Sequence, residues 1–207
     1  RRRDVFSGHI DLKFNIIKGL TFTSSNGVDY YNNTSYSFTP QSVNGAGKNS
    51  MGNSNLQRML LQSSNNITYN HTWNDKHYLT VTGVWEATKS TIRNMGISGS
   101  SLQAESVGWW DVKNAVTRDA TNGYSDWALL SGVGRVIYNY DNRYMLTGTF
   151  RADGSSRFTN DKWGYFPSVA VAWTASNESF MESTRDLISN LKIRASYGVI
   201  GKIGRAH

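Results

Sequence analysis

Residues 135–151 read RVIYNYDNRYMLTGTFR, and this stretch decides the fold class. Apolar or aromatic residues alternate with mostly polar ones on both sides of Asp141 and Asn142. A period of two is typical of a strand that has one apolar and one polar face. Because Asp and Asn favour tight turns, the stretch predicts two antiparallel strands joined by a hairpin.

The same alternation recurs along the chain and predicts about eight strands. We expect them near residues 9–16, 20–30, 67–73, 79–86, 129–140, 143–154, 163–173 and 191–199. Short links near 17–19, 74–76 and 141–142 alternate with long segments rich in Asn, Ser and Gly, at 38–60 and 93–128. The link at 175–190 is expected to hold one or two helical turns, with Asn177 as a possible cap and Glu178 in the first turn.

Charged residues occur on the strand face opposite the apolar and aromatic residues. The charged set is Lys13, Arg135, Arg151, Lys192 and Arg194, and the apolar set includes Leu12, Tyr138, Leu146, Val171 and Ile193. Lipid outside and water inside a barrel produce such a division. A soluble β-sandwich also alternates, but paired strands that approach the ~9–11 residues of a tilted membrane crossing favour a barrel. We predict an all-β fold, an open arc of an antiparallel up-and-down transmembrane β-barrel, with the charged set facing the lumen.

The composition excludes several classes of protein. The chain has 207 residues, no cysteine and a net charge of +7, yet only Arg1–Arg3 form a basic run, so no nucleic-acid partner is expected. No apolar run approaches the ~20 residues of a membrane-spanning helix.

Candidate catalytic and metal motifs fail on their spacing. Residues 45–49 (GAGKN) lack the first glycine and the final Ser or Thr of a phosphate loop. His71, Asp75 and His77 bracket a turn, and alternation places His71 away from His77. Glu178 and Glu182 are interpreted as solvated charges on a short helix. We therefore predict that the protein is not an enzyme and has no metal and no cofactor.

Four sequence blocks in the last third of the chain occur in a fixed order. They are residues 151–158 (RADGSSRF), 163–168 (WGYFPS), 178–180 (ESF) and 191–198 (LKIRASYG). In this order they resemble the signature of the SusC/RagA family of TonB-linked outer-membrane proteins, and residues 18–20 and 134–140 resemble it more loosely. The matching residues of the first two blocks are Arg151, Asp153, Gly154, Ser155, Ser156, Arg157, Phe158, Trp163, Gly164, Phe166, Pro167 and Ser168. Asp153-Gly154 suits a turn with Gly154 at positive φ, and Pro167 predicts a bulge or irregular pairing.

The resemblance implies a partial TonB-dependent receptor barrel over residues 1–202. The implied function is active import of an oligosaccharide or peptide across the outer membrane of a Gram-negative, Bacteroidetes-like bacterium. The implied partners are outer-membrane lipid, a SusD-like surface lipoprotein, and the TonB complex through an N-terminal part that this sequence lacks. Two alternatives are a TonB-dependent siderophore or cobalamin receptor and a secreted β-sandwich module for carbohydrate binding or adhesion.

The chain end departs from the family pattern, which has Asn after Gly201 where this sequence has Lys202. Residues 203–207 (IGRAH) match the translation of a common sequencing adapter, so we expect a non-native tail there.

The segment 93–128 lacks sustained alternation, and we expect a long extracellular loop. It contains four large rings, which are Trp109, Trp110, Tyr124 and Trp127. Long loops are usually functional or disordered, and such rings can stack on sugar or peptide and anchor a protein partner. We predict a substrate-binding or partner-binding role for them; the alternative is that they only pack the loop against the barrel rim.

Overall fold

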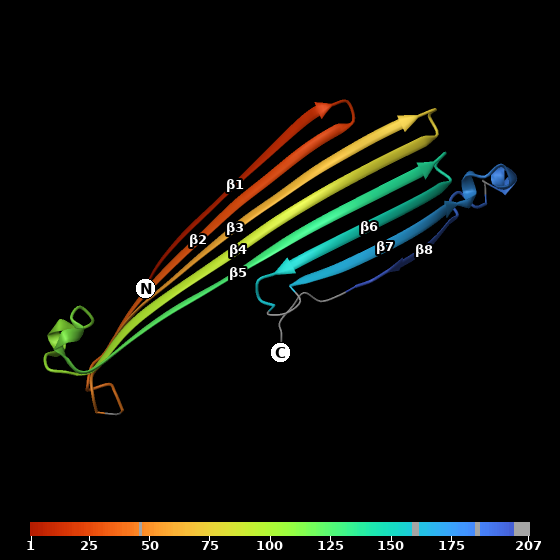
Figure 1. The fold of residues 1–207 in the computed structure, drawn as a ribbon. Helices are drawn as coiled ribbons and strands as arrows, with labels where there is room; N and C mark the ends of the chain where they lie inside the picture. Colours follow the sequence, from red (N-terminus) through yellow and green to blue (C-terminus); the bar gives the residue numbers. More distant parts are fainter. Residues whose placement is uncertain (46, 159–161, 185–186, 201–207) are drawn as a thin grey trace. The chain divides into compact units, whose positions relative to one another are not determined.

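The structure is a computed structural model that describes residues 1–45, 47–158, 162–184 and 187–200. Within these residues it contains eight strands in a single sheet, and each strand lies beside its neighbours in chain order (Figure 1). The strands are β1 (Arg2–Ile17), β2 (Leu20–Thr39), β3 (Ser50–Trp73), β4 (His77–Leu102), β5 (Ala115–Tyr140), β6 (Tyr144–Ser155), β7 (Trp163–Thr174) and β8 (Lys192–Gly198). The predicted antiparallel up-and-down order is confirmed. The expected non-native tail at 203–207 lies outside the described residues.

The chain falls into two units, which are described separately below. The first unit contains residues 1–9, 27–61 and 89–127, and the second contains 10–26, 62–88 and 128–207. Very few hydrophobic residues are buried among the described residues, namely Met51, Leu102, Ala115 and Ala175. A β-sandwich buries a continuous apolar layer between two sheets, so a single sheet with so little core contradicts the sandwich alternative.

Both predicted long loops are much shorter in the structure, and that expectation was wrong. β2 continues to Thr39 and β3 begins at Ser50, so the loop between them holds only residues 40–49. The next loop holds residues 103–114 instead of 93–128. The extra strand residues are mostly polar or small and have no sustained alternation of apolar and polar residues, so the hydrophobic pattern cannot reveal them as strand.

The three short links follow the prediction. Asn74 and Asp75 have φ of 52° and 51°, and Asp141 and Asn142 have φ of 52° and 54°. Asn and Asp tolerate this left-handed region better than other residues with a Cβ. Gly19 has φ of 85°, and an added Cβ there would overlap the carbonyl oxygen of Asn70, so only glycine fits this turn.

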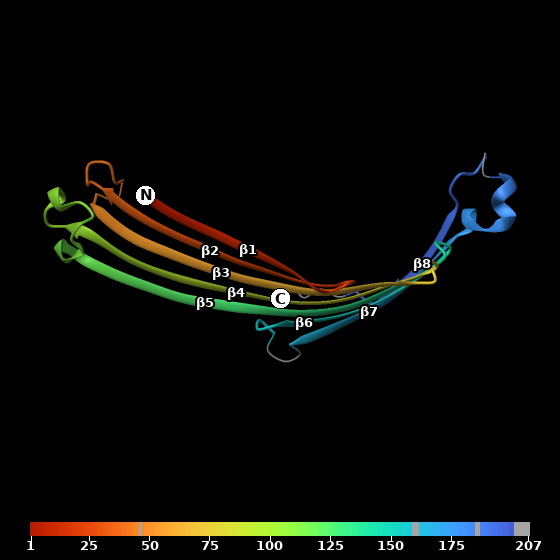
Figure 2. The ribbon, with the colours of Figure 1, turned by 90° about the horizontal axis from the view of Figure 1, so that it is seen from above.

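The link between β7 and β8 contains two short 3-10 turns (Figures 1 and 2, blue), as the sequence predicts. They are η3 (Ala175–Asn177) and η4 (Ser179–Thr184), and Glu178 lies between them instead of within a first turn. Asn177 does not cap a helix; its side-chain amide donates to the carbonyl oxygen of Asn142 at 3.0 Å. Helical segments among the described residues are too short or too polar to cross a membrane.

Candidate functional site

Two neighbouring loops of the first unit are fastened together by a buried asparagine. Asn49, which is 5% exposed, donates through Nδ2 to the carbonyl oxygen of Leu102 at 3.1 Å and to Oε1 of Glu105 at 3.0 Å. Its Oδ1 accepts from the backbone N–H of Leu102. Oε1 of Glu105 also accepts from the backbone N–H of Gln41 at 2.7 Å. We call residues 103–114 the tryptophan loop; it contains η1 (Glu105–Val107) and η2 (Val112–Asn114) and lies beside the loop at 40–49 (Figures 1 and 2, green and orange).

Two of the four predicted site residues, Trp109 and Trp110, lie together in the tryptophan loop. Their ring centroids are 5.9 Å apart, and the ring of Tyr36 lies 6.4 Å from Trp109 and 6.3 Å from Trp110. Trp109 is half-buried against a small core of Met51, Leu102 and Ala115. Trp110 is 78% exposed. Packing therefore explains Trp109 but leaves most of Trp110 available for contact.

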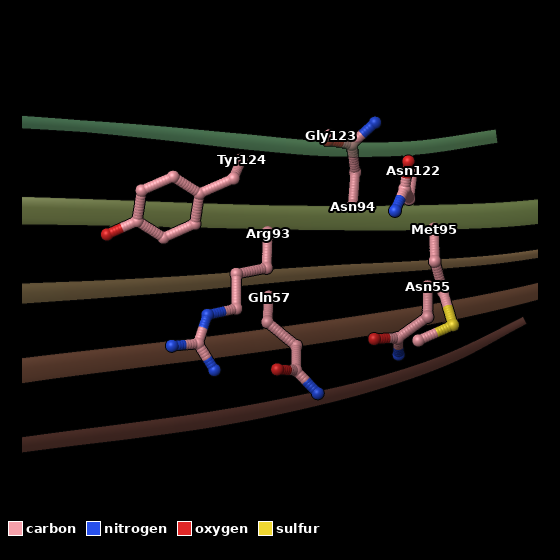
Figure 3. A pocket seen from close by; sticks show the side chains of 8 residues that line it. All are labelled: Asn55, Gln57, Arg93, Asn94, Met95, Asn122, Gly123 and Tyr124. Carbon is pink, nitrogen blue, oxygen red and sulfur yellow. The ribbon is translucent and has the colours of Figure 1, made fainter.

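The other two predicted site residues do not join this cluster, so the expected four-ring loop is corrected. Tyr124 and Trp127 belong to strand β5. Tyr124 instead pairs with Arg93 of β4, whose guanidinium carbon lies 5.9 Å from the ring centroid. Both residues line a cavity of about 460 Å³ within the first unit, shown in Figure 3.

In the second unit, strand register separates the charged residues from the apolar ones. Tyr138 pairs with Leu146, which pairs with Val171, and Ile193 lies beside Trp173 on the same face. The charged set occupies the alternate positions, where Arg135 pairs with Thr149 and Arg194 with Ala172. Hydrogen bonds between neighbouring strands occur on this polar face, including Thr80 to Asn70 at 2.7 Å, Ser64 to Glu86 at 3.1 Å and Arg135 to Thr149 at 3.3 Å.

Aromatic side chains continue the apolar face across the hairpins of the second unit. His77 stacks on Trp73 with ring centroids 5.2 Å apart, and its Nδ1 lies 2.7 Å from the hydroxyl of Tyr138. His71 stacks on the same Trp73 ring at 5.6 Å. The prediction that His71 points away from His77 was therefore wrong, because the turn at 74–76 pairs the two strands with both rings on one face. The described residues include no cluster of three His, Cys, Asp or Glu that could bind a metal.

Glu178 is not the solvated charge that the sequence suggested. Its carboxylate accepts from the Tyr144 hydroxyl at 2.6 Å and from Nε1 of Trp173 at 3.0 Å, and it pairs with Arg143 at 3.3 Å. We call these four residues the Glu178 cluster. The side chain of Glu178 is only 12% exposed. The hydrogen bonds from Tyr144 and Trp173, and then the charge of Arg143, hold the pKa of this carboxyl below its ordinary value.

Comparison with known proteins places these features in a family. No protein-family model matches the chain. Two TonB-dependent receptors of Formosa agariphila are 34% and 30% identical to it, over 194 and 205 residues, or 88% and 97% of this chain. SusC of Bacteroides thetaiotaomicron is 44% identical over 75 residues, which are 36% of this chain and 7% of SusC. The chain belongs to the SusC/RagA family of TonB-dependent receptors.

This receptor segment also has the fold of solved family structures. The RagAB peptide transporter superposes with a TM-score of 0.78 at 22% identity, covering 95% of this chain and 23% of that chain. The segment spans 18% and 20% of the length of the two Formosa relatives. The observed open sheet is therefore part of a larger β-barrel fold.

The signature residues of this receptor segment have structural roles that differ from the predicted ones. Asp153 and Gly154 lie inside β6, where Gly154 pairs with Trp163 and has no positive φ. A Cβ on Gly154 would lie 3.1 Å from the Trp163 ring, so the glycine makes room for the indole. The chain turns after β6 ends at Ser155, where Ser155 Oγ accepts from the backbone N–H of Arg157 at 3.3 Å.

Pro167 produces no bulge in this receptor segment, against the prediction. The register against β6 continues without a break, with Phe166, Pro167 and Ser168 opposite Arg151, Phe150 and Thr149. The Pro167 carbonyl accepts from Val199 at 2.9 Å on the β8 side. In an antiparallel strand, the backbone N–H and carbonyl of one residue point toward the same neighbouring strand. The N–H that proline lacks would therefore point toward β8, next to the last residue pair of β7 and β8.

Sequence reasoning missed two residues of this segment that contact the predicted rings. Tyr36 lies near the end of β2 and Arg93 lies in β4, within or beside the stretches that were interpreted as loops. An isolated tyrosine in the Ser-rich and Asn-rich stretch 32–37 could have indicated Tyr36. Nothing in the spacing of Arg93 and Tyr124, 31 positions apart, could have paired them.

Proposed function

We propose that this chain forms part of the barrel wall of a SusC-like, TonB-dependent importer in the outer membrane of a Bacteroidetes-like bacterium. One observation carries the proposal: in a single sheet of this family, an apolar, aromatic face lies opposite a hydrogen-bonded polar face. Leu146, Val171 and Ile193 are 48%, 50% and 54% exposed. When large apolar side chains that share one face of a sheet are about half exposed, the face is expected to contact a partner or a membrane. A membrane is the contact that fits the barrel fold.

In this proposal, the apolar face contacts lipid and the polar face lines the lumen. Lys13, Arg135, Arg151, Lys192 and Arg194 then face water. Arg151 pairs with Asp153 on that face, with Nε and Oδ2 2.7 Å apart. Strands β3, β4 and β5 have 24 to 26 residues, more than twice the ~9–11 of a bilayer crossing, so much of each strand extends beyond the hydrocarbon.

The facing can be tested with two neighbouring residues of β8 in the complete receptor. Ile193→Arg places a charge in lipid and should destabilise the barrel by about 2–4 kcal/mol near mid-bilayer. Arg194→Ala should leave assembly almost unchanged, because its side chain would face water. Membrane assembly is measured by heat-modifiable electrophoretic mobility. Equal assembly of both variants would contradict the assignment of the faces.

We further propose that the imported nutrient is an oligosaccharide or peptide and that a SusD-like lipoprotein covers the receptor. TonB would act through a part of the receptor outside these residues. The exposed ring of Trp110, supported by Trp109 and Tyr36, would contact the substrate or the lipoprotein at the extracellular mouth. The relatives support the import proposal, since two of them are named TonB-dependent receptors and one similar structure is named a peptide transporter.

The import proposal is tested in cells that carry the complete receptor. Uptake of labelled oligosaccharides and peptides should stop when TonB is deleted. Replacing both Trp109 and Trp110 with Ala should reduce uptake or co-purification of the lipoprotein while barrel assembly stays intact. Uptake that persists without TonB would contradict the importer proposal. If uptake and lipoprotein binding are unchanged in the double variant, the two rings serve only to pack the loop.

A further inference from the structure

A polar cavity of the first unit has the chemistry of a ligand site. It holds about 460 Å³, within the usual size range of small-molecule pockets. Its lining comes from the neighbouring strands β3, β4 and β5 (Figure 3) and consists of Asn55, Gln57, Arg93, Asn94, Met95, Asn122, Gly123 and Tyr124. Four side-chain amides and one guanidinium contribute to it, and none of the lining residues is acidic.

Several of these polar groups lack a partner among the described residues. Arg93 contacts the ring of Tyr124 but forms no ion pair there. The side chains of Gln57 and Asn122 make no hydrogen bond to another described residue. Asn55 differs, because its Nδ2 donates to Asn32 and Thr34 at 2.8 and 3.0 Å, which fixes the amide at the cavity wall and leaves Oδ1 as an acceptor.

The lining residues that project into the cavity share one face of the sheet. Arg93 and Met95 are two apart in β4, and Asn122 and Tyr124 are two apart in β5. Residues two apart in a strand point to the same side. Asn94 occupies the alternate position and covers Gly123, where an added Cβ would overlap its amide. The open cavity therefore offers the guanidinium, the amides of Asn55, Gln57 and Asn122, and the Tyr124 ring, which is 62% exposed.

We propose that this cavity binds an anionic sugar, a ring that carries a carboxylate, sulfate or phosphate group. Guanidinium forms paired, charge-assisted hydrogen bonds with planar and tetrahedral anions. Asn and Gln both donate and accept, as sugar hydroxyls require, and an exposed tyrosine ring offers an apolar face for stacking. The cavity lies on the sheet face assigned above to lipid, because Arg93 shares its side of β4 with His77 and Tyr124 shares its side of β5 with Tyr138. The source that fits this face is the phosphorylated sugars of lipopolysaccharide, since an imported acidic oligosaccharide would pass along the opposite, lumen face.

The first experiment measures binding to the complete receptor in detergent. Calorimetry with a glucuronate-containing disaccharide, glucose 6-phosphate and neutral maltose should give tighter binding of the two anionic probes. Arg93→Gln should weaken their binding at least tenfold and leave that of maltose within twofold. Tyr124→Ala should weaken all three. Arg58→Gln serves as the matched control, because Arg58 lies next to Gln57 on the other face of β3 and outside the cavity.

Two further measurements distinguish the sources. If the source is lipopolysaccharide, Arg93→Gln should reduce the amount that co-purifies with the receptor and leave uptake of acidic oligosaccharide unchanged. If uptake falls instead and the lipopolysaccharide content stays constant, the cavity binds the imported substrate, and both the lipopolysaccharide assignment and the assignment of the faces are contradicted. Arg93→Lys tests whether the guanidinium geometry matters beyond its charge, and it should restore only part of the binding.

The proposal is overturned if Arg93→Gln binds all probes like wild type, or if Arg58→Gln weakens anion binding as much, since general surface charge would then explain it. Assembly of each variant is checked by heat-modifiable mobility, and Arg93→Lys remains informative if Arg93→Gln does not assemble. TonB independence of uptake would contradict the importer proposal but would not affect binding in detergent. The two proposals can therefore fail separately.

Discussion

The tryptophan loop and the β7–β8 link are both short, irregular connections with two 3-10 turns, yet they are held in different ways. The link is fixed by charge, because the Glu178 carboxylate is surrounded by Arg143, Tyr144 and Trp173. The tryptophan loop has no ion pair of this kind among the described residues and is fixed through the buried amide of Asn49, which bonds Leu102 and Glu105, and through the half-buried ring of Trp109. Each connection also exposes one ring: Phe180 of the link is 64% exposed beside Trp173, and Trp110 of the loop is 78% exposed beside Trp109. The difference in what holds them indicates that the link is clamped through Glu178, whereas the loop is supported by the half-buried ring next to the exposed one.

The largest expected effect is the loss of the Asn49 amide. Asn49→Ala leaves the N–H and C=O of Leu102 without their side-chain partners, and Leu102 is 6% exposed. Two unsatisfied buried groups should cost about 2–4 kcal/mol of local stability. Hydrogen exchange of residues 99–114 in the complete receptor should accelerate by roughly 30- to 1,000-fold, since 1.4 kcal/mol corresponds to tenfold.

Asn53→Ala is the matched control for this prediction. Asn53 also contacts the tryptophan loop, through a hydrogen bond from its Nδ2 to the Trp109 carbonyl at 3.0 Å. Its Oδ1 is buried without a hydrogen-bond partner, so the substitution removes one unsatisfied acceptor together with one bond. The net cost should stay below about 1 kcal/mol. Equal exchange in the two variants would contradict the dominant role of Asn49.

The sequence predicted the sheet wherever one strand face is apolar. Tyr138 and Leu146 could be paired because apolar residues alternate with polar ones on both sides of Asp141-Asn142, which marks the turn. Residues 117–123 (TRDATNG) lie in β5 without alternating large apolar residues, so only backbone pairing makes them a strand. That pairing is a property of the neighbouring strands and is not readable from the local sequence.

The candidate site was only half predictable for a related reason. The Trp109-Trp110 dipeptide indicates an aromatic surface by itself, and both residues do lie in a loop. Tyr124 and Trp127 were assigned to the same loop because no alternation separated them from it. The role of Glu178 depends on Arg143 and Tyr144, 35 and 34 residues away, and only the sheet register brings these groups together.

A smaller effect is expected at the link, where charge can be titrated. The pKa of Glu178 is lowered in the folded state, so its contribution to stability is present above the pKa of the unfolded chain. That contribution is lost as the pH falls through the lowered folded-state pKa. Exchange of the amides of residues 174–178, divided by the unfolded-chain rate at each pH, should therefore accelerate below the ordinary pKa range of glutamate.

Glu178→Gln should remove most of this pH dependence and accelerate exchange at neutral pH, because the amide keeps one acceptor but loses the ion pair with Arg143. Glu182→Gln is the control, since Glu182 is an exposed residue of η4 and lies outside the cluster. Exchange of the tryptophan loop at each pH should be the same in wild type, Glu178→Gln and Glu182→Gln. A pH profile of the link that is identical in wild type and Glu178→Gln would show that charge does not fix it.

The smallest stability effect should come from Trp110, although it has the largest exposed ring of the loop. Trp110→Ala removes contacts with Trp109 and Tyr36 only, and an exposed aromatic pair contributes under about 1 kcal/mol. Trp109→Ala removes a half-buried ring from the small core and should cost about 1–3 kcal/mol. Hydrogen exchange across residues 103–114 should therefore change clearly in Trp109→Ala and slightly in Trp110→Ala.

The two single variants separate support from contact, because Trp110→Ala removes the exposed ring and keeps the packing that Trp109→Ala loses. If the loop presents Trp110 to substrate or lipoprotein, Trp110→Ala should reduce uptake or lipoprotein co-purification as much as the double variant does. Trp110→Phe keeps a ring at the same position and should restore part of the activity. If only Trp109→Ala lowers uptake, and does so in proportion to faster exchange, the loop acts like the link, as a structural element with no contact of its own.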